Sequence, residues 1–125
     1  STLSTQSAAK TINRIIDVFP LNDQSEIRTR LALTLKAVLS QVLMRRKDTP
    51  GRVAAREVLF LNNSVANLIR EGKIHQINNV IASNTQKGMV LMDDALISLH
   101  QEGVIHTSDV MSRIVDPEKA RLVLA

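Results

Sequence analysis

Residues 40–61 read SQVLMRRKDTPGRVAAREVLFL, the one stretch of the chain with a strand-like pattern. Both arms of this stretch are rich in Val, Leu and Phe, which favour extended structure. Between the arms, Asp48-Thr49-Pro50-Gly51 has the composition of a tight turn. The pattern predicts two strands, Ser40 to Arg46 and Arg52 to Leu61, paired as an antiparallel hairpin at the edge of a sheet.

Two helices are predicted before the hairpin, because apolar residues recur there at helical spacing. The first spans Ser7 to Phe19, and Pro20 ends it. The second is expected to begin with Asp23 and Glu26 as a capping box. Its buried stripe is predicted to contain Ile27, Leu31, Leu35, Val38 and Leu39.

Every segment after Leu61 is predicted to be helical. The first helix there is capped by Asn62-Asn63-Ser64, with Val65, Leu68 and Ile69 facing inward and Ala66, Asn67 and Arg70 facing outward. Further helices are expected within Lys73 to Ser83, from Asp93-Asp94, from Thr107 or Ser108, and from Asp116-Pro117-Glu118. Their separators are Gly72, Gly88 and Gly103.

Composition limits the classes of function. The 125 residues contain 44% hydrophobic residues, enough for one domain with a buried core, and no cysteine, which excludes disulfides and thiolate metal sites. The net charge of +4 invites a nucleic-acid interpretation, but Phe19 and Phe60 are the only aromatic residues. Because single-strand binding uses exposed rings for stacking, no nucleic-acid partner is expected.

The residues carry no recognisable catalytic or metal signature. His75, His100 and His106 do not pair at the i, i+4 spacing of a helical metal site. Asp93 and Asp94 are adjacent, so they point in different directions and are better interpreted as first-turn helix residues. The sequence also lacks a G-x-x-x-x-G-K-[ST] phosphate loop. The chain alone is therefore expected to bind no cofactor and no metal.

Several segments of the chain, in order, are similar to the motifs of one known protein family. The start STLSTQSAA (residues 1–9) is similar to the family's H-T-x-x-A box, with Ser4 in place of the histidine and Thr5 and Ala8 retained. RIIDVFP (14–20), GRVAARE (51–57) and the Gly88-Met89 pair followed by Asp93 also match. NLIRE (67–71) matches the second half of the family motif A-I-R-N-L-I-R-E, with Ala66 replacing an arginine. Together these segments resemble the PilT-type pilus-retraction ATPases of the secretion-ATPase superfamily, in which that motif is associated with retraction.

The resemblance implies an α/β fragment that is mostly α. Residues 1–61 are expected to form the C-terminal part of a RecA-like P-loop ATPase core, ending in the hairpin, and residues 62–125 a C-terminal helical subdomain. The intact protein is implied to be a hexameric motor that couples ATP hydrolysis, with Mg²⁺, to type IV pilus retraction and twitching motility. It is expected to be cytoplasmic, at the inner membrane, with other copies of itself and the pilus platform protein as partners.

The same resemblance assigns two groups of site residues. Ser4 and Thr5 are implied to be a degenerate catalytic box beside the terminal phosphate of ATP, although serine reaches less far than histidine and cannot become cationic near pH 7. Asn67, Leu68, Ile69, Arg70 and Glu71 are implied to form the coupling motif for retraction.

Two alternatives of different kinds stay open. One is a fragment of another secretion-superfamily ATPase, although the assembly and type II secretion members usually carry a cysteine-rich module where this chain has only a short turn. The other is a non-enzymatic helical binding module. Its affinity for nucleic acid would fall steeply with salt if it bound phosphates.

We expect the 125-residue chain to show no saturable ATP binding by calorimetry and no ATP turnover. The physical reason is the missing glycine-rich loop and lysine, which supply most of the phosphate affinity in P-loop proteins. A P-loop ATPase measured in the same buffer provides the positive control. Saturable binding in the micromolar range would contradict this expectation.

Overall fold

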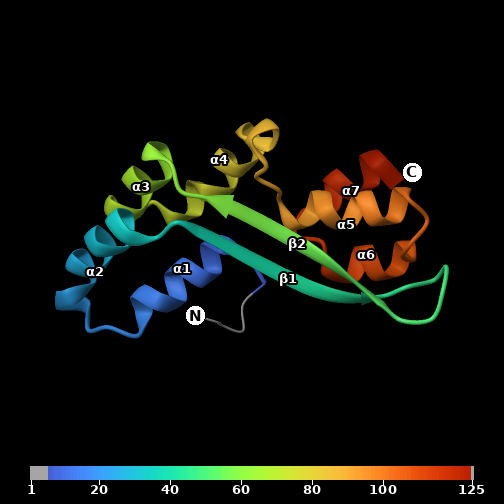
Figure 1. The fold of residues 1–125 in the computed structure, drawn as a ribbon, viewed down its shortest axis with the longest axis horizontal. Coiled ribbons are helices and arrows are strands. Elements are labelled where there is room, and N and C mark those ends of the chain that lie inside the picture. Colours follow the sequence, from blue (N-terminus) through green and yellow to red (C-terminus); the bar gives the residue numbers. More distant parts are fainter. Residues whose placement is uncertain (1–5, 125) are drawn as a thin grey trace.

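A computed structural model describes residues 6–124, which fold as a two-stranded antiparallel hairpin with helices at both ends (Figure 1). Helices α1 (Ala8–Asp17), α2 (Leu21–Thr34), α3 (Asn63–Arg70) and α4 (Ile77–Ser83) lie toward the open end of the hairpin. Helices α5 (Met92–Gln101), α6 (Thr107–Arg113) and α7 (Pro117–Leu124) lie toward its turn. Short 3₁₀ turns occupy Ile74–Gln76 and Thr85–Lys87.

The predicted hairpin is present, and it is longer at its first strand than expected. Strand β1 covers Ala37–Arg45, strand β2 covers Arg52–Phe60, and their register pairs Ser40 with Glu57. In the turn, Gly51 has φ +115, a backbone conformation that residues other than glycine rarely adopt. Arg46 donates hydrogen bonds to both oxygens of Asp48, at 2.9 and 2.7 Å, and this lowers the pKa of Asp48 to about 2.

The predicted extent of the second helix is wrong at both ends. It begins at Leu21 after Pro20, so Asp23 lies within the first turn and no Asp23–Glu26 capping box forms. It ends at Thr34, and Leu35 is already extended, with ψ 133. Val38 therefore points into the core from a strand, while Leu39 is 66% exposed on the opposite face.

The strand alternation gives the hairpin one covered and one open face. Buried side chains occur at every second position of β1 (Val38, Ser40, Val42, Met44) and, on β2, at Ala55, Glu57 and Leu59. Side chains of period two along paired strands share one face. We call this the inner face and the opposite one the outer face.

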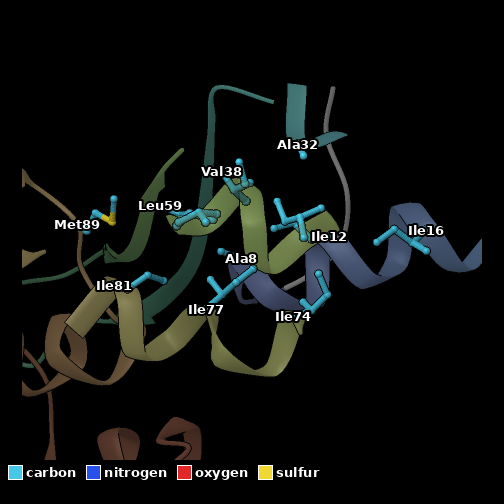
Figure 2. Close-up of a cluster of buried hydrophobic side chains, with 13 residues drawn as sticks. Ala8, Ile12, Ile16, Ala32, Val38, Leu59, Ile74, Ile77, Ile81 and Met89 are labelled. Carbon is cyan, nitrogen blue, oxygen red and sulfur yellow. The ribbon is translucent and has the colours of Figure 1, made fainter. Parts of the chain in front are cut away.

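Two hydrophobic clusters pack against the inner face. The first joins Val38 and Leu59 to α1, α2, α3 and α4, and Figure 2 shows its side chains gathered between the hairpin, α1 and α4. The second joins Val42, Met44 and Ala55 to α5 and α6. Because Ser40 and Glu57 occupy the row between Val38–Leu59 and Val42–Ala55, a polar row separates the two clusters.

The prediction that the region after residue 62 is helical throughout is wrong. Gly88 takes a left-handed conformation, and Val90, just after it, is extended against the edge of β2. Val90 and Val58 exchange two backbone hydrogen bonds of 2.9 and 3.0 Å. The free backbone groups of an edge strand make such pairing favourable, and one isolated bridge results.

The helix signals of the second half are largely confirmed. The Asn62 side chain accepts a hydrogen bond from the Val65 amide at 2.9 Å, as expected of an N-cap. Gly72 and Gly103 have positive φ at helix ends, and Asp116 accepts from the Glu118 amide at the start of α7. One cap is wrong: α6 begins at Thr107 itself, preceded by His106, so neither Thr107 nor Ser108 caps it. Within residues 6–124 no helix is both long enough and apolar enough to span a membrane.

Leu59→Ala and Leu39→Ala should differ in their effect on stability, because Leu59 lies on the inner face of the hairpin and Leu39 on the outer face. Leu59 is fully buried in the first cluster, so its truncation should lower the free energy of unfolding by about 2–5 kcal/mol. Leu39 is 66% exposed, so its truncation should change stability by less than about 0.5 kcal/mol. Chemical denaturation of both variants tests this, and equal losses would contradict the assignment of faces.

Candidate functional site

The degenerate box residues Ser4 and Thr5 lie outside the residues that the structure describes, but the helix that follows them is well defined. Ser7 caps α1, accepting a hydrogen bond from the Lys10 amide at 3.1 Å. In the sequence, Thr5 precedes Ala8, the first residue of α1, by three residues.

The start of α1 is held by Glu57. The Glu57 side chain, 3% exposed, accepts a hydrogen bond from the Ala8 amide at 2.6 Å through Oε2. Its other oxygen, Oε1, accepts from the Met92 amide at 3.1 Å. Ala8 and Met92 are the first residues of α1 and α5, each ten residues long, so one carboxylate faces the positive ends of two helices.

A cavity of about 430 Å³ adjoins this carboxylate. Its walls come from the start of α1, the inner face of the hairpin, the start of α5 and residues 113–119. The charged side chains lining it are three cations and three carboxylates: Lys10, Arg113, Lys119, Glu57, Asp93 and Asp116. Positive and negative groups are balanced, so the lining favours no ligand of one charge.

The two adjacent aspartates of α5 take different roles. Both lie in its first turn, as predicted. Asp93 is 8% exposed and accepts hydrogen bonds from the amides of Val115 and Asp116 at 2.9 and 3.0 Å. Asp94 instead pairs with Lys119 at 2.6 Å. Asp93 thus fastens the start of α5 to the connection between α6 and α7, and Asp94 fastens it to α7 itself.

The histidines and carboxylates do not form a metal centre. Within residues 6–124, no group of three or more His, Asp or Glu side chains is arranged to hold an ion. His100 lies near the end of α5, where its Nδ1 contacts the Ile105 carbonyl oxygen at 3.2 Å. This contact with the loop that follows α5 explains the position of His100 without a metal ligand role.

The predicted coupling residues lie at the end of α3. Asn67 and Arg70 are exposed and hydrogen-bonded to each other, and Glu71 forms an ion pair with Lys73 at 3.3 Å. Ile69 is fully buried and Leu68 half-buried. This arrangement confirms the outward direction expected for Asn67 and Arg70.

The predicted exposure of Ala66 is wrong. Ala66 is 9% exposed and belongs to the first cluster, together with Ala32 of α2. A short helix packed on two sides buries a wider stripe than the Val65, Leu68 and Ile69 positions indicate. Ala66 therefore fits the close approach of α3 to α2, and its replacement of an arginine does not remove a cation from the surface that Asn67 and Arg70 share.

Sequence reasoning missed Glu57 as the central polar group of this site. A signal was present: Glu57 is a carboxylate between Ala55 and Leu59 at the inward positions of an alternating strand. A charged residue at such a position requires hydrogen-bond donors once it is buried. The donors come from Ala8 and Met92, far away in the sequence, and the pattern of β2 alone does not identify them.

Comparison with known proteins finds relatives over most of the chain. No protein-family model matches the chain. It is 48% identical over 104 residues, or 83% of its length, to a twitching motility protein of Neisseria gonorrhoeae, of which it covers 28%. It is 38% identical over 94% of its length to the type IV pilus retraction ATPase PilT of Pseudomonas aeruginosa, of which it covers 34%. It is 32% identical to the type IV pilus ATPase PilU of that organism, covering 32%.

Solved structures agree. The crystal structure of the pilus retraction motor PilT with bound ADP superimposes with a TM-score of 0.82 and 36% identity, over 94% of this chain and 32% of that one. The Legionella pneumophila ATPase DotB gives a TM-score of 0.68 at 20% identity, a likeness of fold alone. The described structure is thus a mostly helical fragment with an antiparallel hairpin that matches part of a pilus motor. The chain is a homologue of the PilT/PilU-type type IV pilus ATPases and spans about 30% of their length.

Glu57→Ala should lower the free energy of unfolding by about 2–5 kcal/mol, because it leaves two buried amides without an acceptor. Glu57→Gln should cost about half as much, since the amide keeps one carbonyl oxygen. Glu102→Ala, at an exposed carboxylate, serves as the matched control. Denaturation measures the cost, and hydrogen exchange at Ala8 and Met92 locates it; a loss no larger than that of the control would contradict the bridging role.

Proposed function

We propose that this chain is the C-terminal part of a hexameric motor ATPase that couples ATP hydrolysis to type IV pilus retraction. The observation that carries the proposal is the match to the pilus retraction motor PilT, with a TM-score of 0.82 over 94% of the chain. The 48% identity to a twitching motility protein supports the same assignment at the level of residues.

Under this proposal the chain contributes two regions to the motor. Residues 1–61 supply the end of a RecA-like core, and residues 62–125 supply the helical subdomain. ATP and Mg²⁺ are bound mainly by other parts of a longer protein, because the 125 residues contain no phosphate loop. Ser4 and Thr5 then contribute the edge of the nucleotide pocket, with the Ser4 hydroxyl in place of an imidazole.

The hydrogen bonds of Glu57 physically couple the two regions, because they join α1 in the first to α5 in the second. Thr5 precedes Ala8, the first residue of α1, by three residues in the sequence, and Glu57 ties Ala8 to the first residue of α5. A shift of the nucleotide-side segment is thereby transmitted to the helices at the turn end of the hairpin, because the start of α5 is also fastened to the α6–α7 connection through Asp93. Rigid elements joined by buried hydrogen bonds carry such coupling.

The partners and location of the motor follow from the same proposal. Copies of the whole protein form the ring, and the ring acts on the pilus platform protein from the cytoplasmic side of the inner membrane. The exposed Asn67–Arg70 end of α3 is the surface proposed to pass force to the load. A retraction motor is preferred to another secretion ATPase because identity to DotB is only 20% and no cysteine module is present.

Arg70→Ala is predicted to uncouple retraction from ATP turnover. The experiment replaces the matching segment of P. aeruginosa PilT with this chain and measures ATP turnover and twitching of the chimera. Arg70→Ala should leave turnover within about twofold and strongly reduce twitching, since an exposed arginine contributes little to folding. In the isolated chain its cost should be about 1 kcal/mol or less, whereas Ile69→Ala should cost about 2–5 kcal/mol.

Arg14→Ala, at an exposed arginine of α1, is the matched control and should affect neither activity. Normal twitching with Arg70→Ala would remove the coupling role from α3. A chimera that forms rings and hydrolyses ATP but never retracts would count against the proposed function itself.

A further inference from the structure

Two buried carboxylates, those of Glu57 and Asp93, hold the starts of three helices together. Glu57 is 3% exposed and accepts hydrogen bonds from the amides of Ala8 and Met92, the first residues of α1 and α5. Asp93 is 8% exposed and accepts from the amides of the two residues before α7, at 2.9 and 3.0 Å. Because Asp93 directly follows Met92, the four hydrogen bonds form one continuous connection from α1 to α7. We call this connection the Glu57–Asp93 linkage.

The linkage joins two parts of the fold that pack separately. The buried side chains of α1 belong to the first hydrophobic cluster and those of α5 and α6 to the second, and no buried residue of the described chain belongs to both. Apolar packing is non-directional, whereas a hydrogen bond weakens steeply when its donor and acceptor move out of line. A displacement of the start of α1 therefore displaces the start of α5, or it leaves a buried donor without its acceptor.

Helix α7 is fastened to the start of α5 by a second contact. Asp94 pairs with Lys119 of α7 at 2.6 Å, and Ala120 of α7 is fully buried. The side chains of Lys119 and Asp94 are 34% and 40% exposed, so this ion pair contributes little to folding. It can therefore be removed to release α7 without unfolding the chain.

We propose that α7 regulates nucleotide binding by the motor through the Glu57–Asp93 linkage, with Glu57 and Asp93 as positioning residues. The inference rests on the proposed function, in which the residues before α1 contribute the edge of the nucleotide pocket. A nucleotide that fixes the start of α1 then also fixes α7, because the four hydrogen bonds hold both. Coupling between two sites is reciprocal for binding free energies, so a change that releases α7 weakens nucleotide binding in turn.

The isolated 125-residue chain tests the linkage without any nucleotide. Asp93→Asn keeps one acceptor oxygen and loses the other, so it should loosen the connection to α7 and, through Met92, the start of α1. Hydrogen exchange at the Ala8 amide should accelerate about tenfold. Val110→Ala in α6 is the control, because Val110 is fully buried in the second cluster but lies outside the linkage. Equal exchange at Ala8 in the two variants, compared at equal loss of global stability, would overturn the linkage.

The chimera with P. aeruginosa PilT tests the regulation. Binding of a fluorescent ADP is measured for Asp93→Asn and Lys119→Ala, with Glu102→Gln at an exposed carboxylate as the control. Asp93→Asn should raise the Kd for ADP about fivefold and Lys119→Ala about threefold, while the control stays within about twofold. When Asp93→Asn is combined with Glu57→Gln, the joint effect should fall well below the product of the single effects, because both changes interrupt one connection.

Two results with the chimera would overturn the regulatory role. The first is an unchanged ADP affinity in both Asp93→Asn and Lys119→Ala. The second is a pair of single effects that multiply in the double variant, since Glu57 and Asp93 would then act independently. If the Asp93→Asn chimera forms no rings, Lys119→Ala decides alone, because its exposed side chain is not needed for folding. A chimera that forms rings but binds no ADP counts against the proposed function instead, and hydrogen exchange at Ala8 then decides on the linkage.

Discussion

The carboxylate of Glu57 is the constraint on which this fold depends. It lies in a polar row on the inner face of the hairpin, between one hydrophobic cluster around α1 and α4 and a second around α5 and α6. Its two oxygens accept from the first amides of α1 and α5. A buried carboxylate is tolerated only when hydrogen-bond donors replace the lost water, and here the orphan amides of two helix starts supply them. The group that separates the clusters is therefore also the group that joins them.

This arrangement bears on how the chain is divided. The expected division after residue 61 separates the hairpin from the helices that follow, and it stays a prediction. Side-chain packing groups α3 and α4 with α1 and α2, in the cluster that includes Val38 and Leu59. The helices at the turn end, α5 and α6, form the other group with Val42 and Ala55. Both groups share one sheet face, so motion of either one is limited by the same two strands.

The sequence predicted local signals well and long-range ones poorly. Gly51, Gly72 and Asn62 act within a few residues of themselves, so their turn and cap roles were predicted correctly. The predicted end of the second helix was wrong because Leu35, Val38 and Leu39 fit helical spacing as well as the start of a strand. Only the pairing with β2 decides between the two. The predicted exposure of Ala66 and the predicted helix at Val90 were wrong for a related reason, because Ala66 packs in the cluster that includes α2 and Val90 pairs with the edge of β2. Glu57 required knowledge of partners 49 and 35 residues away.

The two faces of the hairpin answer different requirements. On the inner face, burial and hydrogen bonding restrict every position, so a change at Leu59 or Glu57 alters the fold before it alters any activity. On the outer face, Leu39 and Arg45 are exposed, so substitutions there leave the packing of both clusters intact. The exposed end of α3 is a second surface of this kind, where Arg70 is ordered by Asn67 without being buried.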